Sequence, residues 1–246
     1  MVLQFGEEVS ALKARIKFRK YGAMKFIGHL DIMRYFQKAM RRAEIPIAFT
    51  GGYSPHMIMS FANPLGVGVT SDGEYFDIEL TESIASDQAV KQLNDAMVEG
   101  MEIVSFVEIP DNKKETGMSI VAAADYLSGV KNGQFPSDWK ERVNDFMAQD
   151  EIKVWKATKK SEKEVDIKPM IYQFEVRDDN IYMQVATGSV ENLKPGLVME
   201  AFAKYLGVED ENLSFYHHRL EVYANVGTEE KKEFVSLESL GENIEA

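Results

Sequence analysis

The sequence predicts an α+β protein built from two tandem units, each with the element order βαββαβ. Short segments that alternate apolar and polar residues, as half-buried strands do, are interspersed with segments whose apolar residues recur at helical spacing. This succession occurs once before a polar stretch at residues 111–120 and again after it. Because βαββαβ is the order of the ferredoxin-like split βαβ unit, we expect two ferredoxin-like domains.

In the first half, residues 14–19 alternate apolar and basic side chains and are predicted to form a strand. A helix with a cationic outer face follows, because apolar residues recur there at helical spacing with basic residues between them. Its apolar stripe consists of Leu30, Met33, Phe36, Ala39, Met40 and Ala43. The remaining predicted elements are strands at 47–49, 57–61 and 75–80, a helix from Ser86, its N-cap candidate, to Val98, and a strand at 103–109.

In the second half, the polar stretch 111–120 is the predicted linker. The same patterns predict strands at 124–130, 152–158, 170–177, 181–186 and 214–223, with helices at 136–148 and 195–206. Asp178, Asp179 and Asn180 mark a tight hairpin turn, and Gly207 closes the second helix. The predicted boundaries are an N-terminal extension at 1–13, domains at 14–110 and 121–225, and an acidic tail at 226–246.

The acidic tail has two interpretations. It either frays in solvent or forms a short helix that carries apolar side chains onto a partner. Those side chains are Phe234, Val235, Leu237 and Leu240.

Composition excludes several classes of protein. The chain has 246 residues, 45% of them hydrophobic, and no cysteine. Disulfides, thiolate metal sites, iron–sulfur clusters and a cysteine nucleophile are therefore excluded. The N-terminus lacks the apolar region of a signal peptide, and no stretch approaches the roughly 20 apolar residues that span a bilayer. We expect a cytoplasmic protein that does not enter a membrane.

The four histidines do not predict a metal site. They stand at positions 29, 56, 217 and 218, without the short helical spacing of zinc ligands. His217 and His218 are neighbours on a predicted strand, so their side chains face opposite sides of the sheet. We expect neither a metal ion nor another cofactor.

Charge is distributed unevenly along the chain. The net charge is −12, yet the segment from Lys13 to Arg42 holds ten basic residues and one acidic residue, a net of +9. Such segregation indicates a surface that binds an anionic partner, either RNA or an acidic protein surface, although charged residues also line ordinary solvated faces. The predicted RNA-binding residues are Lys17, Arg19, Lys25, Arg34, Lys38, Arg41 and Arg42.

Potential site residues follow the basic segment closely. His29 could act as a general base supported by Asp31, with Tyr53 as a further catalytic residue, or it could serve local structure or ligand binding. The glycine and proline loops offer backbone N–H groups and serine hydroxyls to an anion, although turns need the same composition. The predicted ligand-binding residues are Gly52, Tyr53, Ser54, Pro55, His56, Ser71, Glu74 and Asp77.

Glu74 and Asp77 do not form a predicted acid/base pair. They stand three apart on a strand and therefore face opposite ways. The sequence also contains no phosphate-binding P-loop, dinucleotide-binding fingerprint or serine-nucleophile elbow.

Several motifs resemble one bacterial family. They are GHLD at 28–31, then RRAEIPIAFT, GGYSPHMIMSF, PLGVG and SDGEYFDIEL, followed by VDIKPMI at 165–171 and SVENLKPGLVMEAF at 189–202. In these the chain resembles the bacterial radical-SAM-linked domain family (domain of unknown function 2344) over most of residues 14–223. Positions that fit its motifs are His29, Asp31, Gly52, Tyr53, Pro55, Pro64, Gly66, Ser71, Glu74 and Asp77.

The resemblance implies an accessory role beside a cobalamin-binding radical SAM protein. This chain cannot carry the radical SAM cluster itself, since it has no CxxxCxxC motif. Our leading hypothesis is an accessory module that binds RNA, or a nucleotide or phosphate ligand, and that is not an enzyme on its own.

Two alternatives remain open. The first is a metal-independent ribonuclease or transferase that uses His29 and Tyr53, on a fold like that of the CRISPR repeat-associated endoribonucleases, which is an analogy of fold alone. The second is a protein-interaction scaffold. The sequence predicts no particular oligomeric state.

Overall fold

The computed structural model describes residues 12–112, 114–157 and 162–245. The first half contains β1 (Leu12–Lys20), η1 (Gly22–Phe26), α1 (His29–Arg42), β2 (Met59–Ala62), β3 (Thr70–Leu80), α2 (Ser86–Asp95) and β4 (Met101–Ile109). Of the predicted N-terminal extension, residues 1–11 lie outside the described part.

The second half begins with the short helix α3 (Gly117–Ile120). It continues with β5 (Val121–Asn132), α4 (Val143–Ala148), β6 (Lys153–Ala157), β7 (Glu162–Asp166), η2 (Lys168–Met170), β8 (Ile171–Arg177), β9 (Asn180–Ala186), α5 (Pro195–Tyr205), β10 (Ser214–Asn225), β11 (Phe234–Ser236) and η3 (Leu237–Leu240). The elements η1, η2 and η3 are short 3-10 helices.

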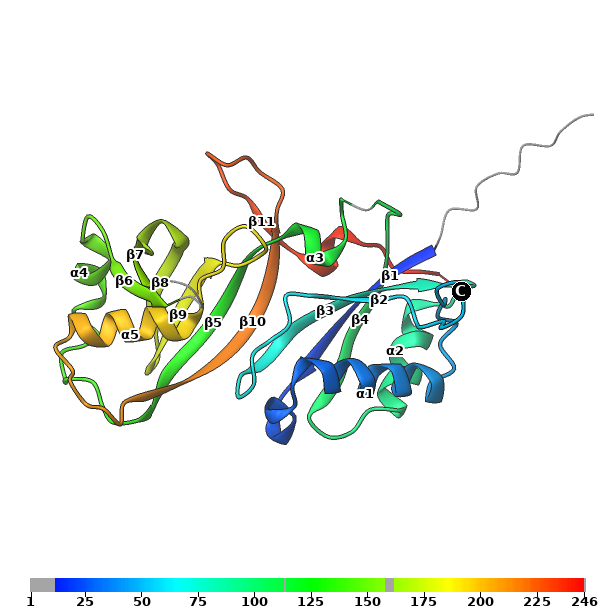
Figure 1. Ribbon diagram of the computed structural model, residues 1–246, viewed down its shortest axis with the longest axis horizontal. Coiled ribbons are helices and arrows are strands. Elements are labelled where there is room, and N and C mark those ends of the chain that lie inside the picture. Colours follow the sequence, from blue (N-terminus) through cyan, green and yellow to red (C-terminus); the bar gives the residue numbers. More distant parts are fainter. Residues whose placement is uncertain (1–11, 113, 158–161, 246) are drawn as a thin grey trace, which may run out of the picture.

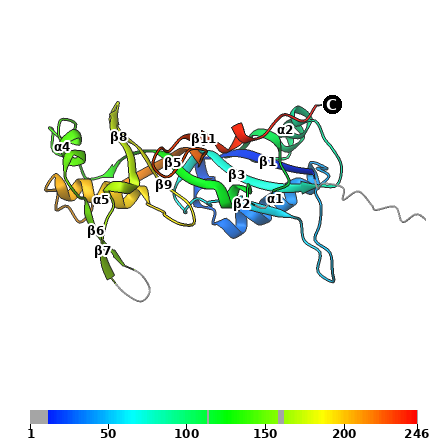
Figure 2. The ribbon, with the colours of Figure 1, turned by 90° about the horizontal axis from the view of Figure 1, so that it is seen from above.

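One large sheet runs through both halves (Figure 1). Its strand order is β4-β1-β3-β10-β5-β9-β8, with β2 paired to β3 and β11 paired to β10. Strand pairs within it are antiparallel except for β3 and β10, which are parallel. β6 and β7 form a separate hairpin that projects from the body (Figure 2). The predicted mixture of helices and strands is confirmed, with a mostly antiparallel sheet.

The first-half core contains a cluster of aromatic rings. Phe18 of β1, Phe36 of α1 and Phe76 of β3 are at most 1% exposed, and their ring centroids lie 4.7–5.7 Å apart. Fully burying such a ring stabilises the fold by about 1.5–3 kcal/mol. The predicted apolar stripe of α1 is therefore correct at Phe36, but wrong at Leu30, which is 61% exposed. Ile32, one turn before Phe36, is buried instead.

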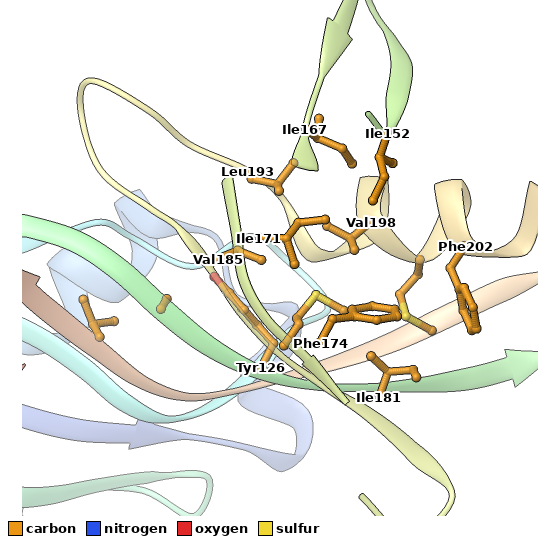
Figure 3. Close-up of a cluster of buried hydrophobic side chains, with 14 of the residues drawn as sticks. Tyr126, Ile152, Ile167, Ile171, Phe174, Ile181, Val185, Leu193, Val198 and Phe202 are labelled. Atoms are coloured by element: carbon orange, nitrogen blue, oxygen red, sulfur yellow. The ribbon is translucent and has the colours of Figure 1, made fainter. Parts of the chain in front are cut away.

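The second-half core lies between α5 and the strands of its half of the sheet. Figure 3 shows Val198 and Phe202 of α5 beside Phe174, Ile181 and Val185. The predicted helix at 195–206 and the hairpin turn at 178–180 are confirmed, and Gly207 has the positive φ of +76° that ends a helix well.

Several predicted elements are wrong in type or length. Residues 47–49 form isolated bridges, from Ile47 to Leu80 and from Phe49 to Met57, rather than a strand. α2 ends at Asp95, and Ser86 is not its N-cap, because its hydroxyl accepts a hydrogen bond from the Ile244 amide instead.

In the second half, turns occupy residues 137–142, so the predicted helix begins only at Val143. The predicted strand at 152–158 corresponds to β6, whose partner β7 was not predicted, and Thr158 lies outside the described residues.

The acidic tail folds back onto the sheet. β11 pairs with β10, and Leu237 is fully buried. The prediction that the tail frays is wrong, since burial of Leu237 and the strand pairing hold it. The polar stretch 111–120 also contacts the first half, where the Gly117 amide donates to Asp77 at 2.7 Å. In the described part of the chain, no helix is long and apolar enough to cross a membrane.

Candidate functional site

The two halves of the sheet meet along β3 and β10. These strands pair through Thr70 with His218 and through Ser71 with Arg219. On the other side of β3, Ser71 is the partner of Lys20, the last residue of β1. Lys20, Ser71 and Arg219 therefore form one row across three strands, to which both halves contribute.

Lys20 and Arg219 are buried beside one carboxylate, that of Glu74. These three side chains, which we call the junction cluster, belong to residues that are at most 4% exposed. Arg219 donates to the Glu74 carboxylate and, at 3.1 Å, to the carbonyl of Asn63. Burial lowers the pKa of Lys20, with Glu74 opposing the shift and Arg219 adding to it. The cluster thus has two cationic side chains for one carboxylate.

A cavity of about 610 Å³, the interunit pocket, lies beside this cluster. Residues 63–66 line one side and residues 192–197 line another, while Tyr126, His217 and Arg219 also contribute to its wall. The first of these loops belongs to the first half, and the second leads into α5. The pocket is therefore assembled from segments that are distant in sequence.

His217 is a neutral member of the pocket. Its Nδ1 lies 2.8 Å from the Ser128 hydroxyl, and burial lowers its pKa to about 4. At pH 7 the imidazole is therefore uncharged and can donate or accept one hydrogen bond at Nε2. The prediction that His217 and His218 face opposite sides is confirmed, because His218 instead contacts Thr70 and Asp72.

His29 lies next to the interunit pocket rather than in it. It is the first residue of α1 and packs edge-on against Phe61, with ring centroids 5.3 Å apart. It lines a second cavity, which shares Asn63 and Pro64 with the interunit pocket. On the exposed side of α1, the Asp31 carboxylate accepts a hydrogen bond from the Arg34 guanidinium at 3.2 Å. Asp31 therefore contacts an arginine there, and not the imidazole that it was predicted to support.

Tyr53 occupies a different end of α1. The loop 50–56 follows the C-terminal end of this 14-residue helix, which spans about 20 Å, whereas His29 begins it. Tyr53 is fully exposed, and its loop projects from the body (Figure 2). The loop is closed by contacts between Thr50 and His56. The predicted loop residues Gly52, Tyr53, Ser54, Pro55 and His56 are all exposed and stand apart from His29.

The three predicted ligand-binding residues of β3 are buried. Ser71 accepts a hydrogen bond from the Gly73 amide, and Glu74 belongs to the junction cluster. Asp77 forms two hydrogen bonds with the Arg15 guanidinium, at 2.8 and 3.0 Å. As predicted, Glu74 and Asp77 do not pair with each other, since each has its own arginine.

The basic segment divides between interior and surface. Lys17 forms ion pairs with Glu221 and Glu238 at 2.7 and 2.6 Å and is mostly buried, so a contact with RNA would have to break both. Arg19 pairs with Asp72 and Glu102, and the half-buried Lys25 lies over the Phe26 ring. The cations that remain exposed on α1 are Arg34, Lys38, Arg41 and Arg42, which we call the cationic face.

Several residues of the junction were not predicted as site residues. They are Lys20, Tyr126, Trp155, Lys194, His217 and Arg219. The motif at 189–202 was a usable signal, because its Lys-Pro-Gly lies where a helix begins. No signal in the sequence links Arg219 to Glu74, which is 145 residues away.

The interunit pocket combines a charged, a neutral and a backbone feature. Around one cavity it brings together the buried Arg219, the neutral His217 imidazole and the start of α5. In the described part of the chain, no three histidine, aspartate or glutamate side chains gather as a metal site requires.

The comparisons with known proteins identify a family. Residues 13–195 match domain of unknown function 2344, described as an uncharacterized protein conserved in bacteria. No curated protein matches the chain. A solved Cbf5-Nop10-Gar1 complex is similar at a TM-score of 0.42 and 13% identity, over 85% of this chain and 48% of that chain. The present chain thus spans about half the length of that match.

A second solved structure, an unknown protein from Galdieria sulphuraria, has a TM-score of 0.24 and 13% identity, over 85% of this chain and 98% of that one. The family match covers most of the chain, including the first-half motifs, loop 63–66 and residues 192–195. The protein therefore belongs to the bacterial family of domain of unknown function 2344.

Proposed function

We propose that the protein is an accessory module that binds RNA through the cationic face of α1. The observation that carries the proposal is that Arg34, Lys38, Arg41 and Arg42 are all exposed on one helix of a chain whose net charge is −12. Among these four, only Arg34 has a nearby carboxylate in the described structure, that of Asp31. A row of exposed cations can follow successive phosphates of a strand, and the acidic remainder of the surface would repel RNA elsewhere.

The proposal also names a partner protein and assigns a fold to each half of the chain. The family resemblance supports a cobalamin-binding radical SAM protein as the partner to which the RNA is presented. The strand order β4-β1-β3-β2 in the first half recurs as β10-β5-β9-β8 in the second, if the β6–β7 hairpin is set aside. We infer two ferredoxin-like units joined edge to edge along β3 and β10.

The first prediction concerns salt. If the four cations neutralise about four phosphates of a single strand, the logarithm of the binding constant should fall with log salt at a slope near −3. Fluorescence anisotropy with a labelled single-stranded RNA, measured between low and physiological salt, would give this slope. An affinity that does not change with salt would contradict the proposal.

Charge reversal then locates the surface. Replacing Arg34, Lys38 and Arg41 with glutamate should weaken RNA binding by about 100-fold or more, because attraction becomes repulsion. Thermal stability should change little, since exposed substitutions rarely cost more than about 0.5 kcal/mol. The matched control reverses the exposed Lys114, Lys131 and Lys204, which changes net charge equally but leaves α1 intact. Equal losses in both triple variants would show that only net charge matters.

The same RNA tests the enzymatic alternative. An accessory module should leave the labelled RNA intact on a denaturing gel. The His29→Ala variant should also leave it intact and should have nearly the same thermal stability. Metal-independent cleavage by the natural sequence that disappears in His29→Ala would replace the accessory function by a nuclease.

A further inference from the structure

We propose that the interunit pocket binds a nucleoside 5′-monophosphate, with the phosphate beside Arg219 and the start of α5 and the base against Trp155. This site is separate from the cationic face of α1. The proposal therefore stands whether or not RNA binds there.

The first argument is the charge balance of the junction cluster. Arg219 pairs with Glu74, and Lys20 lies near both without an ion pair of its own among the described residues, in a region that is almost closed to water. A buried cation without its own anion is costly, and this cost falls when an anion binds nearby. An anionic ligand in the pocket next to Arg219 would supply a second negative charge, so that the two cations would face two anions.

The second argument is an unused hydrogen-bond donor. The Nε of Arg219 is buried and has no hydrogen-bond partner among the described residues, while the two terminal nitrogens donate to Asn63 and Glu74 and the Tyr126 side chain lies close to the guanidinium. Buried donors are nearly always satisfied in native proteins, so an unsatisfied one beside a cavity indicates a missing acceptor. Phosphate oxygens are strong acceptors that arginine recognises well.

The third argument is the start of α5. Lys194, Pro195 and Gly196 line the pocket where this 11-residue helix begins, so its positive dipole end faces the cavity. Lys194 adds a charge at the opening. Glu200, one turn further along, carries the opposing charge and would keep the phosphate near Gly196 rather than deeper along the helix.

The fourth argument concerns the rest of the ligand. The cavity of about 610 Å³ is far larger than a phosphate ion needs and lies within the range of about 300–1,000 Å³ for small-molecule sites. Trp155 lines it and is 65% exposed, so its indole face is available for stacking. A base of any identity can stack on an aromatic side chain, because every base has a π-face. A phosphate joined to a planar heterocycle fits these features together.

Calorimetric titration of the full chain would test the site. The probes are the ribonucleoside 5′-monophosphates, the matching nucleosides and inorganic phosphate. We expect at least one monophosphate to bind at least tenfold more tightly than its nucleoside or phosphate alone, because both halves of the ligand are held. Absence of binding by every monophosphate, or equal binding of the nucleosides, would overturn the proposal.

One variant closes the pocket without harming the fold. A side chain at position 196 would point toward His217 Nε2, which lies 3.5 Å from the position of its Cβ. Gly196→Leu should therefore abolish monophosphate binding, while leucine's better helix propensity keeps the melting temperature unchanged or higher. Gly51→Leu, in an exposed loop with open space around it, is the matched control and should bind normally. Normal binding by Gly196→Leu would place the ligand elsewhere.

A second variant tests the charge argument. Lys20→Met keeps a side chain of similar shape but removes its charge. One cation, Arg219, then remains for the one carboxylate of Glu74. We expect monophosphate affinity to fall about tenfold with no loss of thermal stability. A purely structural lysine would give the reverse, a destabilised protein with unchanged affinity. The triple reversal on α1 should not affect monophosphate binding, which separates this site from the RNA surface.

Discussion

Replacing Arg15 with methionine should destabilise the protein by about 3–5 kcal/mol, the largest loss we expect from a single substitution. The Arg15 guanidinium is buried and donates to both oxygens of Asp77, to the carbonyl of Leu237 at 3.1 Å and to that of Glu115 at 3.0 Å. The substitution would leave the Asp77 carboxylate buried without its cation. It would also remove the two hydrogen bonds by which Arg15 holds the backbone of residues 115 and 237 against β1. Urea denaturation followed by circular dichroism would measure the change.

A double variant separates the charge from the contacts. In Arg15→Met combined with Asp77→Leu, no unpaired carboxylate remains, so the combined loss should be smaller than the sum of the two single losses by at least about 1 kcal/mol. Arg34→Met is the control, because Arg34 pairs with Asp31 on the exposed face of α1 and should cost less than about 0.5 kcal/mol. A loss below about 1 kcal/mol for Arg15→Met would show that the interior carries this charge without needing its pair.

The second large effect should appear on acidification and depends on His217. Burial lowers its pKa from 6.5 to about 4 in the folded protein. Between these values the unfolded chain binds a proton that the folded protein does not, so stability must fall as pH decreases from about 6.5 toward 4. The loss from this one group should be on the order of 3 kcal/mol. It should be complete below the folded pKa.

Comparison with a variant isolates this contribution from that of the carboxylates. His217→Gln cannot be protonated in this range, so its unfolding free energy should decline less steeply between pH 7 and 4 than that of the natural sequence. His56→Gln changes an exposed histidine and should keep the natural pH profile. Parallel profiles for the natural sequence and His217→Gln would show that His217 accepts its proton freely in the folded state.

Local patterns predicted much of the secondary structure. Alternation identified β1 because its two faces differ sharply: Ile16 and Phe18 pack under α1, while Arg15 and Lys17 pair with carboxylates on the other side. Elements that are stabilised by contacts distant in sequence were harder to predict. β11 is short and acidic segments surround it, so its pairing with β10 and the burial of Leu237 depend on tertiary contacts that no periodicity reports.

The candidate site was predicted only in part for a similar reason. His29 and Glu74 were selected from the first-half motifs, and both lie at or beside the junction. The charge count took Lys17 and Arg19 as surface cations because their partners, Glu221 and Glu102, lie 204 and 83 residues away in sequence. Net charge along a sequence does not show which cations are neutralised after folding. The basic side chains of α1 were assigned correctly to the surface, because helical spacing alone places them there.

The central position of β10 has a consequence for synthesis. This strand comes late in the sequence, yet it lies between β3 and β5, so β5 keeps a long open edge, and β3 a short one at Thr70 and Ser71, until residues 214–225 have left the ribosome. Unpaired strand edges are the usual starting points of aggregation, and nascent chains expose them for as long as translation lasts. The two partial sheets become one only when the final segment inserts between them. Interrupted translation before residue 214 would therefore release chains that self-associate, rather than a smaller folded protein.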